Sequence, residues 1–346
     1  MKIAYVIEKM SDKGGMERII TDKMNYLAAH TAHEVLLILL WHDPKPLAYK
    51  LDGRIRVLHL NVPGRFIPMA LWRFARIIRK EHPDITIYEK VMGAFMAAFS
   101  GWKGRGIFES HTVRHALPHQ WVIDCMEHRI DAVVSLTEAD SKEFLKAERK
   151  YVIPNFTLIH PDREADYSSH HCLCLARFTY EKNLQRMVRI WQKAVKAHPD
   201  WHLDIVGEGP DEEDIRHLIV ELGVSESITI HKPTDNVLNH YLNSSIYLMT
   251  SRFEGMPMVL IEATTCGLPI VSVDCNYGPR HIVKDGETGF LTPYDDDEAM
   301  AEAIGRLMDD QELRRTMGHN AIQASSAYRP SHIMAQWLQL FNTLAR

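Results

Sequence analysis

The sequence is poor in cysteine and has no long hydrophobic run. Its five cysteines are odd in number, and no two of them have C-x-x-C spacing. This pattern disfavours both a disulfide framework and a structural zinc site, and it suits a reducing compartment. The longest apolar runs, such as VLLILLW at 35–41, are far shorter than the roughly 20 residues needed to span a bilayer. We therefore expect a chain that does not cross a membrane.

Several signatures of metal and cofactor sites are also absent. There is no H-E-x-x-H motif, and no G-x-G-x-x-G follows a strand. The second absence disfavours a nicotinamide-dependent oxidoreductase. The first apolar stretch has only the length of a strand before the Gly14–Gly15 turn, so we do not expect a signal peptide.

Length and charge indicate two halves with different partners. The chain has 346 residues, more than one hydrophobic core usually supports. Its net charge is −5, but residues 1–150 carry an excess of basic side chains and the remainder an excess of acidic ones. A basic half suits an anionic membrane or acceptor. The acidic half and the lack of a readout motif disfavour nucleic-acid binding.

Short apolar runs alternate with amphipathic runs along the whole chain. Strands are predicted at 2–9 and 33–41, and helices at 16–30, 69–82 and 331–344. Buried strands separated by helices are typical of parallel sheets covered on both faces. We therefore predict an α/β fold with two doubly wound Rossmann-like domains that face each other across a cleft. The predicted parts are an acceptor-side domain at 1–158, a linker at 159–170, a donor-binding domain at 171–328, and a C-terminal helix at 329–346 that packs back toward the first domain.

The stretch SRFEGMPMVLIEA contains two carboxylates that invite comparison with an acid–base pair. A predicted strand leads into the loop EGMP, and a helix follows, which places Glu254 in the loop and Glu262 two turns along. Eight residues of helix span roughly 12 Å, whereas cooperating glycosidase carboxylates lie about 5–9.5 Å apart. The spacing therefore favours two separate tasks. The loop amides at the start of the helix favour an anion.

The motifs together resemble glycosyltransferase family 4, whose members are retaining enzymes with the GT-B fold. The resemblance rests on EGMPMVLIE, on ARFTYEKN and on the Gly-Gly turn of KGGMER. It is extended, in the family's order, by FESHT, VIPN, VGEGP and DGETGFL. After ITIH this chain has Lys232 and Pro233 where the family often has glycine, which leaves the contacts to the nucleobase open.

The resemblance implies a role for each matching residue. Arg177 and Lys182 would hold the donor diphosphate and offset the charge of the leaving group. Glu254 and His111 would bind the transferred sugar. The residues implied in catalysis are thus Arg177, Lys182, Glu254 and His111. Those implied in donor binding are Gly14, Gly15, Gly255, Met256, Pro257, Met258 and Glu262, the last of these on the ribose.

The implied reaction moves a sugar from a nucleotide-activated donor, with a UDP-sugar favoured, to a glycan or lipid-linked glycan in bacterial surface polysaccharide synthesis. The leaving phosphate would help to deprotonate the acceptor, and neither a metal ion nor a cofactor is implied. Two alternatives stay open. A sugar-nucleotide epimerase would convert a donor with no acceptor present, and a non-catalytic subunit would bind the donor without turnover.

The acceptor side is less specific. Residues 65–80 form a basic, aromatic amphipathic stretch that suits an anionic membrane, although the same pattern fits an ordinary packed helix. Glu89, Arg114 and His115 are candidates for acceptor contacts because they follow predicted strands of the first domain. We expect a cytoplasmic protein that acts at the inner face of the cell membrane.

Overall fold

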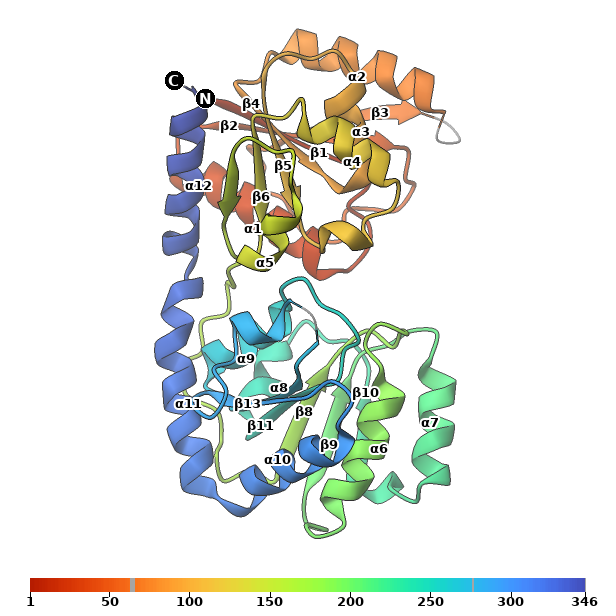
Figure 1. Ribbon diagram of the computed structural model, residues 1–346, viewed down its shortest axis with the longest axis vertical. Helices are drawn as coiled ribbons and strands as arrows, with labels where there is room; N and C mark the ends of the chain where they lie inside the picture. The colour runs from red at the N-terminus through yellow and green to blue at the C-terminus, as the bar shows by residue number, and fades with distance from the viewer. Residues whose placement is uncertain (63–65, 276, 346) are drawn as a thin grey trace. The chain divides into compact units, whose positions relative to one another are not determined.

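A computed structural model describes residues 1–62, 66–275 and 277–345 of the chain (Figure 1). It consists of two α/β units. The first comprises Met1–Phe156 together with Pro330–Arg346, and the second comprises Thr157–Arg329.

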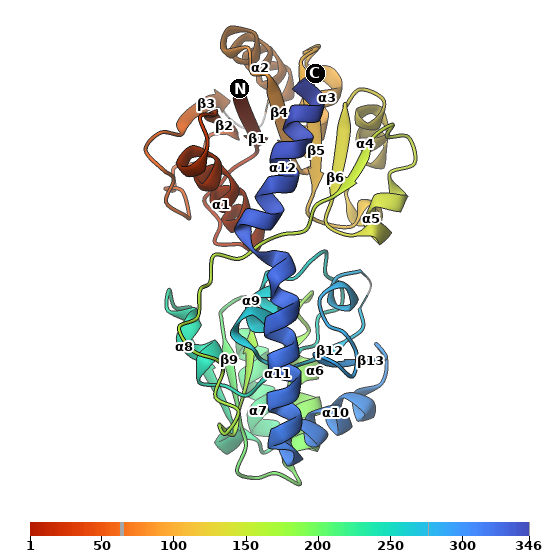
Figure 2. The ribbon, with the colours of Figure 1, turned by 90° about the vertical axis from the view of Figure 1, so that its left-hand side faces the viewer.

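In the first unit, the described residues form a seven-stranded parallel sheet in the order β3-β2-β1-β4-β5-β6-β7. Its strands are β1 (Lys2–Ile7), β2 (Glu34–Trp41), β3 (Arg56–Val62), β4 (Ile85–Glu89), β5 (Arg105–Ser110), β6 (Ala132–Ser135) and β7 (Lys150–Val152). Its helices are α1 (Gly15–His30), α2 (Ile67–Glu81), α3 (Lys90–Phe99), α4 (Gln120–Glu127), α5 (Glu138–Glu143) and α12 (Pro330–Ala345), with a short 3-10 turn η2 (Arg114–Ala116). Figure 2 shows α1 and α12 on one face of this sheet.

In the second unit, the described strands form a six-stranded parallel sheet in the order β10-β9-β8-β11-β12-β13. They are β8 (His171–Leu175), β9 (His202–Val206), β10 (Ile228–His231), β11 (Ile246–Met249), β12 (Ile270–Val273) and β13 (Gly289–Thr292). The helices are α6 (Leu184–Val195), α7 (Glu212–Glu221), α8 (Val237–Leu242), α9 (Met258–Cys266), α10 (Asp297–Asp309) and α11 (Gln311–Ser325). Short 3-10 turns are η3 (Ser225–Ser227), η4 (Pro279–His281) and η5 (Ser326–Tyr328).

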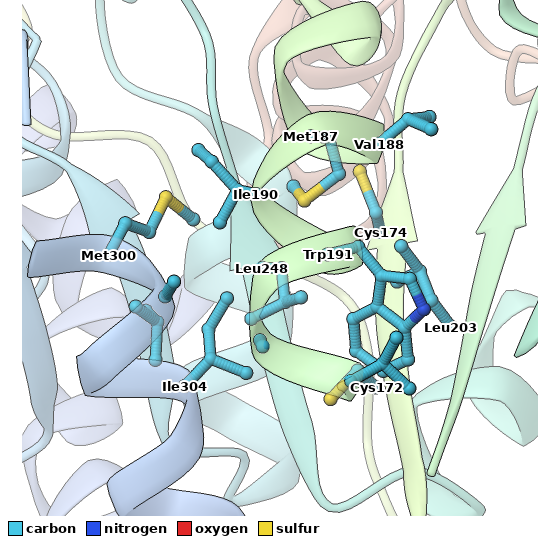
Figure 3. Close-up of a cluster of buried hydrophobic side chains, with 14 of the residues drawn as sticks. Cys172, Cys174, Met187, Val188, Ile190, Trp191, Leu203, Leu248, Met300 and Ile304 are labelled. Carbon is cyan, nitrogen blue, oxygen red and sulfur yellow. The ribbon is translucent and has the colours of Figure 1, made fainter. Parts of the chain in front are cut away.

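Each sheet is held by apolar strands that are buried on both faces, as the near-continuous run EVLLILLW of β2 illustrates. In the second unit, α6 packs its apolar face onto β8 and β9, with Trp191 fully buried (Figure 3). Cys172 and Cys174 lie in the same cluster and are core residues. These two thiols are therefore packing groups, and burial raises the pKa of Cys174 to about 12.

Several predicted elements appear with nearly the predicted ends. The helix predicted at 16–30 is Gly15–His30, and the one predicted at 69–82 is Ile67–Glu81. Residues 159–170, predicted as a linker, are counted with the second unit, where the backbone N–H of Ala165 donates to Cys266 O at 3.0 Å. The C-terminal helix is counted with the first unit. Among the described helices, none is both long and apolar enough to cross a membrane.

The order of the strands creates one switch point in each sheet. In the first sheet it lies between β1 and β4, and in the second it lies between β8 and β11. At these places successive crossovers leave in opposite directions, which opens a crevice at the carboxyl ends of the strands. The predicted site residues follow these strand ends.

Candidate active site

The switch point of the second sheet gathers three of the predicted residues. The segment after β8 carries Arg177 and Lys182, and the segment after β11 carries Glu254. Because β8 and β11 are neighbours in the sheet, residues 72 positions apart in the chain meet there. This is the position at which doubly wound sheets bind ligands.

Lys182 and Glu254 form an ion pair at this switch point. Lys182 Nζ lies 2.6 Å from Glu254 Oε1. Their side chains are only 22% and 11% exposed, so the pair is largely shielded from water. Arg177 is exposed, and none of the ion pairs between described residues involves it. An anion that arrived here would meet one uncommitted cation and would compete with Glu254 for the other.

Arg252 holds the two loops together, and the sequence analysis did not identify it. Its side chain donates to Tyr180 O at 3.1 Å and to Asn183 Oδ1 at 3.0 Å. Its backbone N–H donates to Glu181 O at 2.8 Å. The guanidinium also lies over the Tyr180 ring, 4.3 Å from its centroid. The position of Arg252, two residues before Glu254, could have drawn attention to it. Its partners could not be predicted, because they lie in the segment that follows another strand, β8.

The loop after Glu254 leads directly into α9. Its residues Gly255, Met256 and Pro257 precede the first helical residue, Met258, and Pro257 occupies the N-cap position. A Cβ added to Gly278 would lie 2.7 Å from Pro257 Cδ and 2.8 Å from Glu254 Cβ. The loop is therefore packed too tightly at this point to admit a side chain. Its first-turn amides give the site a partial positive charge.

Glu262 lies further along α9 and is nearly buried, at 3% exposure. Its Oε2 accepts a hydrogen bond from the Tyr241 hydroxyl at 2.8 Å. Burial first, and the Glu262 carboxylate second, raise the pKa of Tyr241 well above its ordinary value, so the hydroxyl stays a donor. The two signature glutamates thus have different partners, Lys182 for one and Tyr241 for the other.

The Gly14–Gly15 turn lies after β1, beside the switch point of the first sheet. Gly14 is the N-cap of α1, with an extended φ of −131°. No left-handed backbone requires glycine at this position. A Cβ on Gly14 would instead come within 2.5 Å of Glu17 Oε2, and Glu17 pairs with Lys90 at 2.8 Å.

A pocket of about 260 Å³ opens next to this turn within the first unit. Its wall is largely apolar, with Met16, Leu117 and Pro118 among the lining residues, and His111 and Lys90 supply polar groups. Glu89 does not line the pocket and is fully buried behind His111. The structure thus places the predicted His111 at a cavity, whereas the carboxylate of Glu89 faces the interior.

A buried charged cluster adjoins the pocket, and two of its members, His111 and Glu109, line the pocket wall. His111 Nε2 is 3.1 Å from Glu89 Oε2 and 3.3 Å from Glu109 Oε1. Lys23 reaches Glu109 from α1 and forms an ion pair with it. Sequence reasoning missed Lys23 and Glu109 because a lone lysine in an amphipathic helix and a strand glutamate carry no recognisable signal.

The pKa values of the two carboxylates in the cluster are shifted in opposite directions. Burial and the neighbouring Glu109 raise the pKa of Glu89 to about 7. Burial also opposes ionisation of Glu109, but Lys23 and His111 outweigh it and lower its pKa below the ordinary value. Glu89, Glu109 and His111 bring ligand atoms within 4.8 Å of one another, a spacing that a metal ion can occupy. Because the Lys23 ammonium already supplies a cation there, we assign no metal to the cluster.

Arg114 and His115 lie in η2, just beyond the pocket-lining residues. Arg114 is committed to internal partners, since it donates to Glu127 Oε1 at 2.9 Å and to Gln120 Oε1 at 2.8 Å. His115 is exposed, and its Nδ1 lies 3.0 Å from Glu143 Oε1. Of the two, His115 offers the more accessible polar group.

Comparison with known proteins identifies the family. Residues 157–324, nearly all of the second unit, match the family model described as glycosyl transferases group 1. The chain belongs to the group 1 glycosyltransferases. The Lys182–Glu254 pair and Glu262 of this glycosyltransferase all lie within the matched region.

Two curated relatives span almost the same length as this glycosyltransferase. The amylovoran biosynthesis glycosyltransferase AmsD of Erwinia amylovora is 27% identical over 359 residues, which cover 99% of each chain. A Campylobacter jejuni α-1,4-N-acetyl-D-galactosaminyltransferase, named for an undecaprenol-diphosphate-linked acceptor, is 25% identical over 370 residues and 98% of each chain. Glycosyltransferases similar to this chain therefore function in bacterial polysaccharide and glycan synthesis.

Among solved structures, S. aureus TarM crystallised with fondaparinux, α-GlcNAc-glycerol and UDP superposes on this glycosyltransferase with a TM-score of 0.84. The two are 15% identical, and the match covers 99% of each chain. This likeness shows the fold, which is the predicted GT-B fold with two Rossmann-like units.

Proposed function

We propose that this group 1 glycosyltransferase moves a sugar, with retention of configuration, from a nucleotide-activated donor to a glycan or lipid-linked glycan of a bacterial surface polysaccharide. The observation that carries the proposal is the Lys182–Glu254 ion pair at the switch point of the second sheet. It supplies a cation for a diphosphate and a carboxylate for sugar hydroxyls at adjacent positions. A UDP-sugar is the favoured donor, since the TarM complex contains UDP.

In the proposed donor complex, the diphosphate displaces Glu254 from Lys182. The ammonium then binds phosphate together with Arg177, and the freed carboxylate of Glu254 accepts from hydroxyls of the sugar. Partial positive charge is added by the backbone amides at the start of α9, which are those of Gly255, Met256 and Met258. Two fixed cations stabilise the departing diphosphate, so the mechanism needs no metal ion. Lys182 is thus already positioned to bind the leaving diphosphate.

Other predicted residues keep the roles that the resemblance implies. Glu262 binds the ribose, and its hydrogen bond from Tyr241 fixes the position of one carboxylate oxygen. The Gly14–Gly15 turn is assigned to the phosphates and His111 to the donor sugar. The Campylobacter jejuni relative is named for an α-linkage in its product, which is the product that retention gives from a donor with an α-linked sugar.

For the acceptor, the exposed loop of η2 near the pocket of the first unit is a better candidate than the buried Glu89. The pocket itself has a mostly apolar wall with a polar edge, which suits the sugar ring of the donor beside His111. His115, exposed close to the pocket, is the proposed acceptor contact, with Arg114 holding its loop in place through Glu127 and Gln120.

We further propose that α2 touches an anionic membrane surface at the inner face of the cell membrane. Ile67 and Trp72 are exposed on this helix, Trp72 to 61%, and Phe66 is exposed at its N-cap. The basic side chains Arg76, Arg79 and Lys80 of the helix are exposed as well. Exposed aromatic and basic side chains on one helix are typical of interfacial helices. Arg73 does not contribute, because it donates to Leu60 O at 2.7 Å. Arg65 of the predicted stretch lies outside the described residues.

A thermal-shift panel with UDP-, GDP- and ADP-sugars tests the donor. Ligand at 100 times its Kd stabilises the native state by about 2.7 kcal/mol, which is easily measured. We expect one nucleotide class to raise Tm in the wild type and not in Lys182→Ala. Transfer of the sugar to a lipid-linked acceptor then tests catalysis. Conversion of the donor to its epimer without acceptor, or binding without turnover of any kind, would contradict the proposal.

A further inference from the structure

Two acidic side chains lie side by side inside the first unit. Glu89 and Glu109 are direct partners in the register of β4 and β5 and therefore point to the same face of the sheet. They are 0% and 1% exposed. Burying two like charges costs free energy unless they are compensated, so the arrangement calls for a reason.

Lys23 compensates one of the two charges. It is itself 1% exposed, it pairs with Glu109, and its Nζ lies 4.9 Å from the centre of the Trp337 ring on α12. Elements α1, β4, β5 and α12 thus enclose the cluster. Tyr5 of β1 is also buried there, and burial, Glu109 and Glu89 raise its pKa well above the ordinary value, so it carries no charge.

His111 belongs both to this cluster and to the wall of the pocket, which Glu109 also lines. Its Nε2 lies at contact distance from both carboxylates, although neither contact meets the angles of a hydrogen bond, and Nε2 has no other partner among the described residues. An ionised carboxylate accepts hydrogen bonds and donates none. Glu109 is ionised because its pKa is lowered, and Glu89 is ionised above its pKa of about 7. A ring nitrogen that faces two carboxylates is therefore stable only when it carries the proton. The ring also lines the pocket.

We propose that Glu89 and Glu109, balanced by Lys23, are positioning residues that hold His111 as the Nε2–H tautomer and turn its Nδ1 toward the pocket. There Nδ1 accepts a hydrogen bond from a hydroxyl of the donor sugar. This assignment rests on the proposed function for its substrate, but the tautomer itself follows from the cluster alone. The positioning role also explains why two carboxylates are buried at sites where apolar side chains would cost less free energy.

Kinetics of Glu89 variants test the positioning role. Glu89→Met removes the acceptor but leaves the Lys23–Glu109 pair balanced, so the fold should persist, with Tm equal to or above that of the wild type. We expect its kcat to fall roughly 10- to 100-fold, since a misplaced contact of about 1 Å can cost that much. Glu89→Gln, which keeps an acceptor oxygen, should restore most of the activity. Glu81→Met is the matched control, because Glu81 pairs with Arg56 away from the cluster.

A double-mutant cycle separates positioning from general packing. If Glu89 acts through His111, Glu89→Met should have no further effect in a His111→Ala background. Equal losses in both backgrounds, or wild-type activity of Glu89→Met, would overturn the assignment.

A spectroscopic measurement tests the tautomer without any donor. In protein labelled with ¹⁵N-histidine, the His111 signals are those that disappear in His111→Ala. We expect the pattern of a ring protonated on Nε2 in the wild type and of mixed tautomers in Glu89→Met. A wild-type ring protonated only on Nδ1 would overturn the proposal. Absence of sugar transfer in the wild type would instead refute the proposed function and leave this result standing.

Discussion

The Lys182–Glu254 ion pair predicts opposite effects of two substitutions on nucleotide binding. If donor diphosphate must displace Glu254, then Lys182→Ala should weaken UDP binding and Glu254→Gln should strengthen it. The glutamine keeps the size of the side chain, releases the ammonium and removes a negative charge next to the phosphates. A site in which both residues bind the nucleotide directly would lose affinity in both variants.

The magnitude follows from the burial of the pair. With exposures of 22% and 11%, it is more shielded than a surface ion pair, whose typical worth is 0–1 kcal/mol. We take about 1 kcal/mol as the free energy needed to part it, after discounting for partial solvent screening. Glu254→Gln should therefore tighten UDP binding about fivefold. For transfer, loss of the Lys182 charge should lower kcat roughly 10²- to 10³-fold, the cost of removing one stabilising group from a developing anion.

Isothermal titration of UDP and steady-state transfer assays measure these effects. Lys193→Ala is the matched control, since Lys193 lies on the helix that follows Lys182 and pairs with the exposed Glu298. It should leave both Kd and kcat unchanged. Weaker UDP binding by Glu254→Gln, or near-wild-type turnover by Lys182→Ala, would refute the displacement model.

Three further predictions concern other parts of the molecule. Glu262→Ala should raise donor KM more than it lowers kcat, because a ribose contact acts in the ground state and the transition state alike, and a pure loss of kcat would contradict that role. The free energy of unfolding should fall on acidification, as a thermal scan across pH would show. Burial lowers the pKa of His202 and of His240 below 6.5 in the folded state. As pH drops through 6.5, these side chains therefore take up protons first in the unfolded chain, which favours unfolding. Asp204 adds a second decline below pH 3.8, because burial opposes its ionisation but its hydrogen bonds with His231 and His171 lower its pKa further. A Tm that stays level or rises between pH 7 and 5 would contradict the decline assigned to His202 and His240. His240→Gln should make that decline smaller. Replacing Arg76, Arg79 and Lys80 together by alanine should weaken binding to anionic vesicles more than 100-fold at about 1 kcal/mol per basic residue, and unchanged sedimentation with vesicles would remove the membrane assignment.

Periodicity predicted the long amphipathic helices well but failed where a segment is apolar all round. The helix predicted at 16–30 differs from α1 by one residue, because polar and apolar positions alternate with the helical period. No element was predicted for Lys90–Phe99, whose sequence KVMGAFMAAF shows no polar face. Such a run fits a buried strand and a buried helix equally well, and only its packing against β4, β5 and α4 selects the helix.

For the candidate site, residue spacing was enough to predict the local chemistry. The order of EGMPMVLIE predicts a loop carboxylate and a helix carboxylate that are too far apart for one acid–base step. The motifs also indicate the family, which the match over residues 157–324 supports. These inferences need only residue spacing within one element or one loop, which secondary structure translates directly into geometry.

Tertiary structure alone decided which distant residues meet. Lys182 reaches Glu254, 72 positions away, because β8 and β11 are neighbours in the sheet. Lys23 reaches Glu109, 86 positions away, because α1 lies on the face of the first sheet to which Glu109 points. Strand order and helix packing are set by the total burial of apolar surface in each unit, a sum over many residues that no local pattern contains. For the same reason, the sequence showed Glu89 only as a polar residue at a strand end. The fold shows that it lies behind His111, against a second carboxylate and beside a buried lysine.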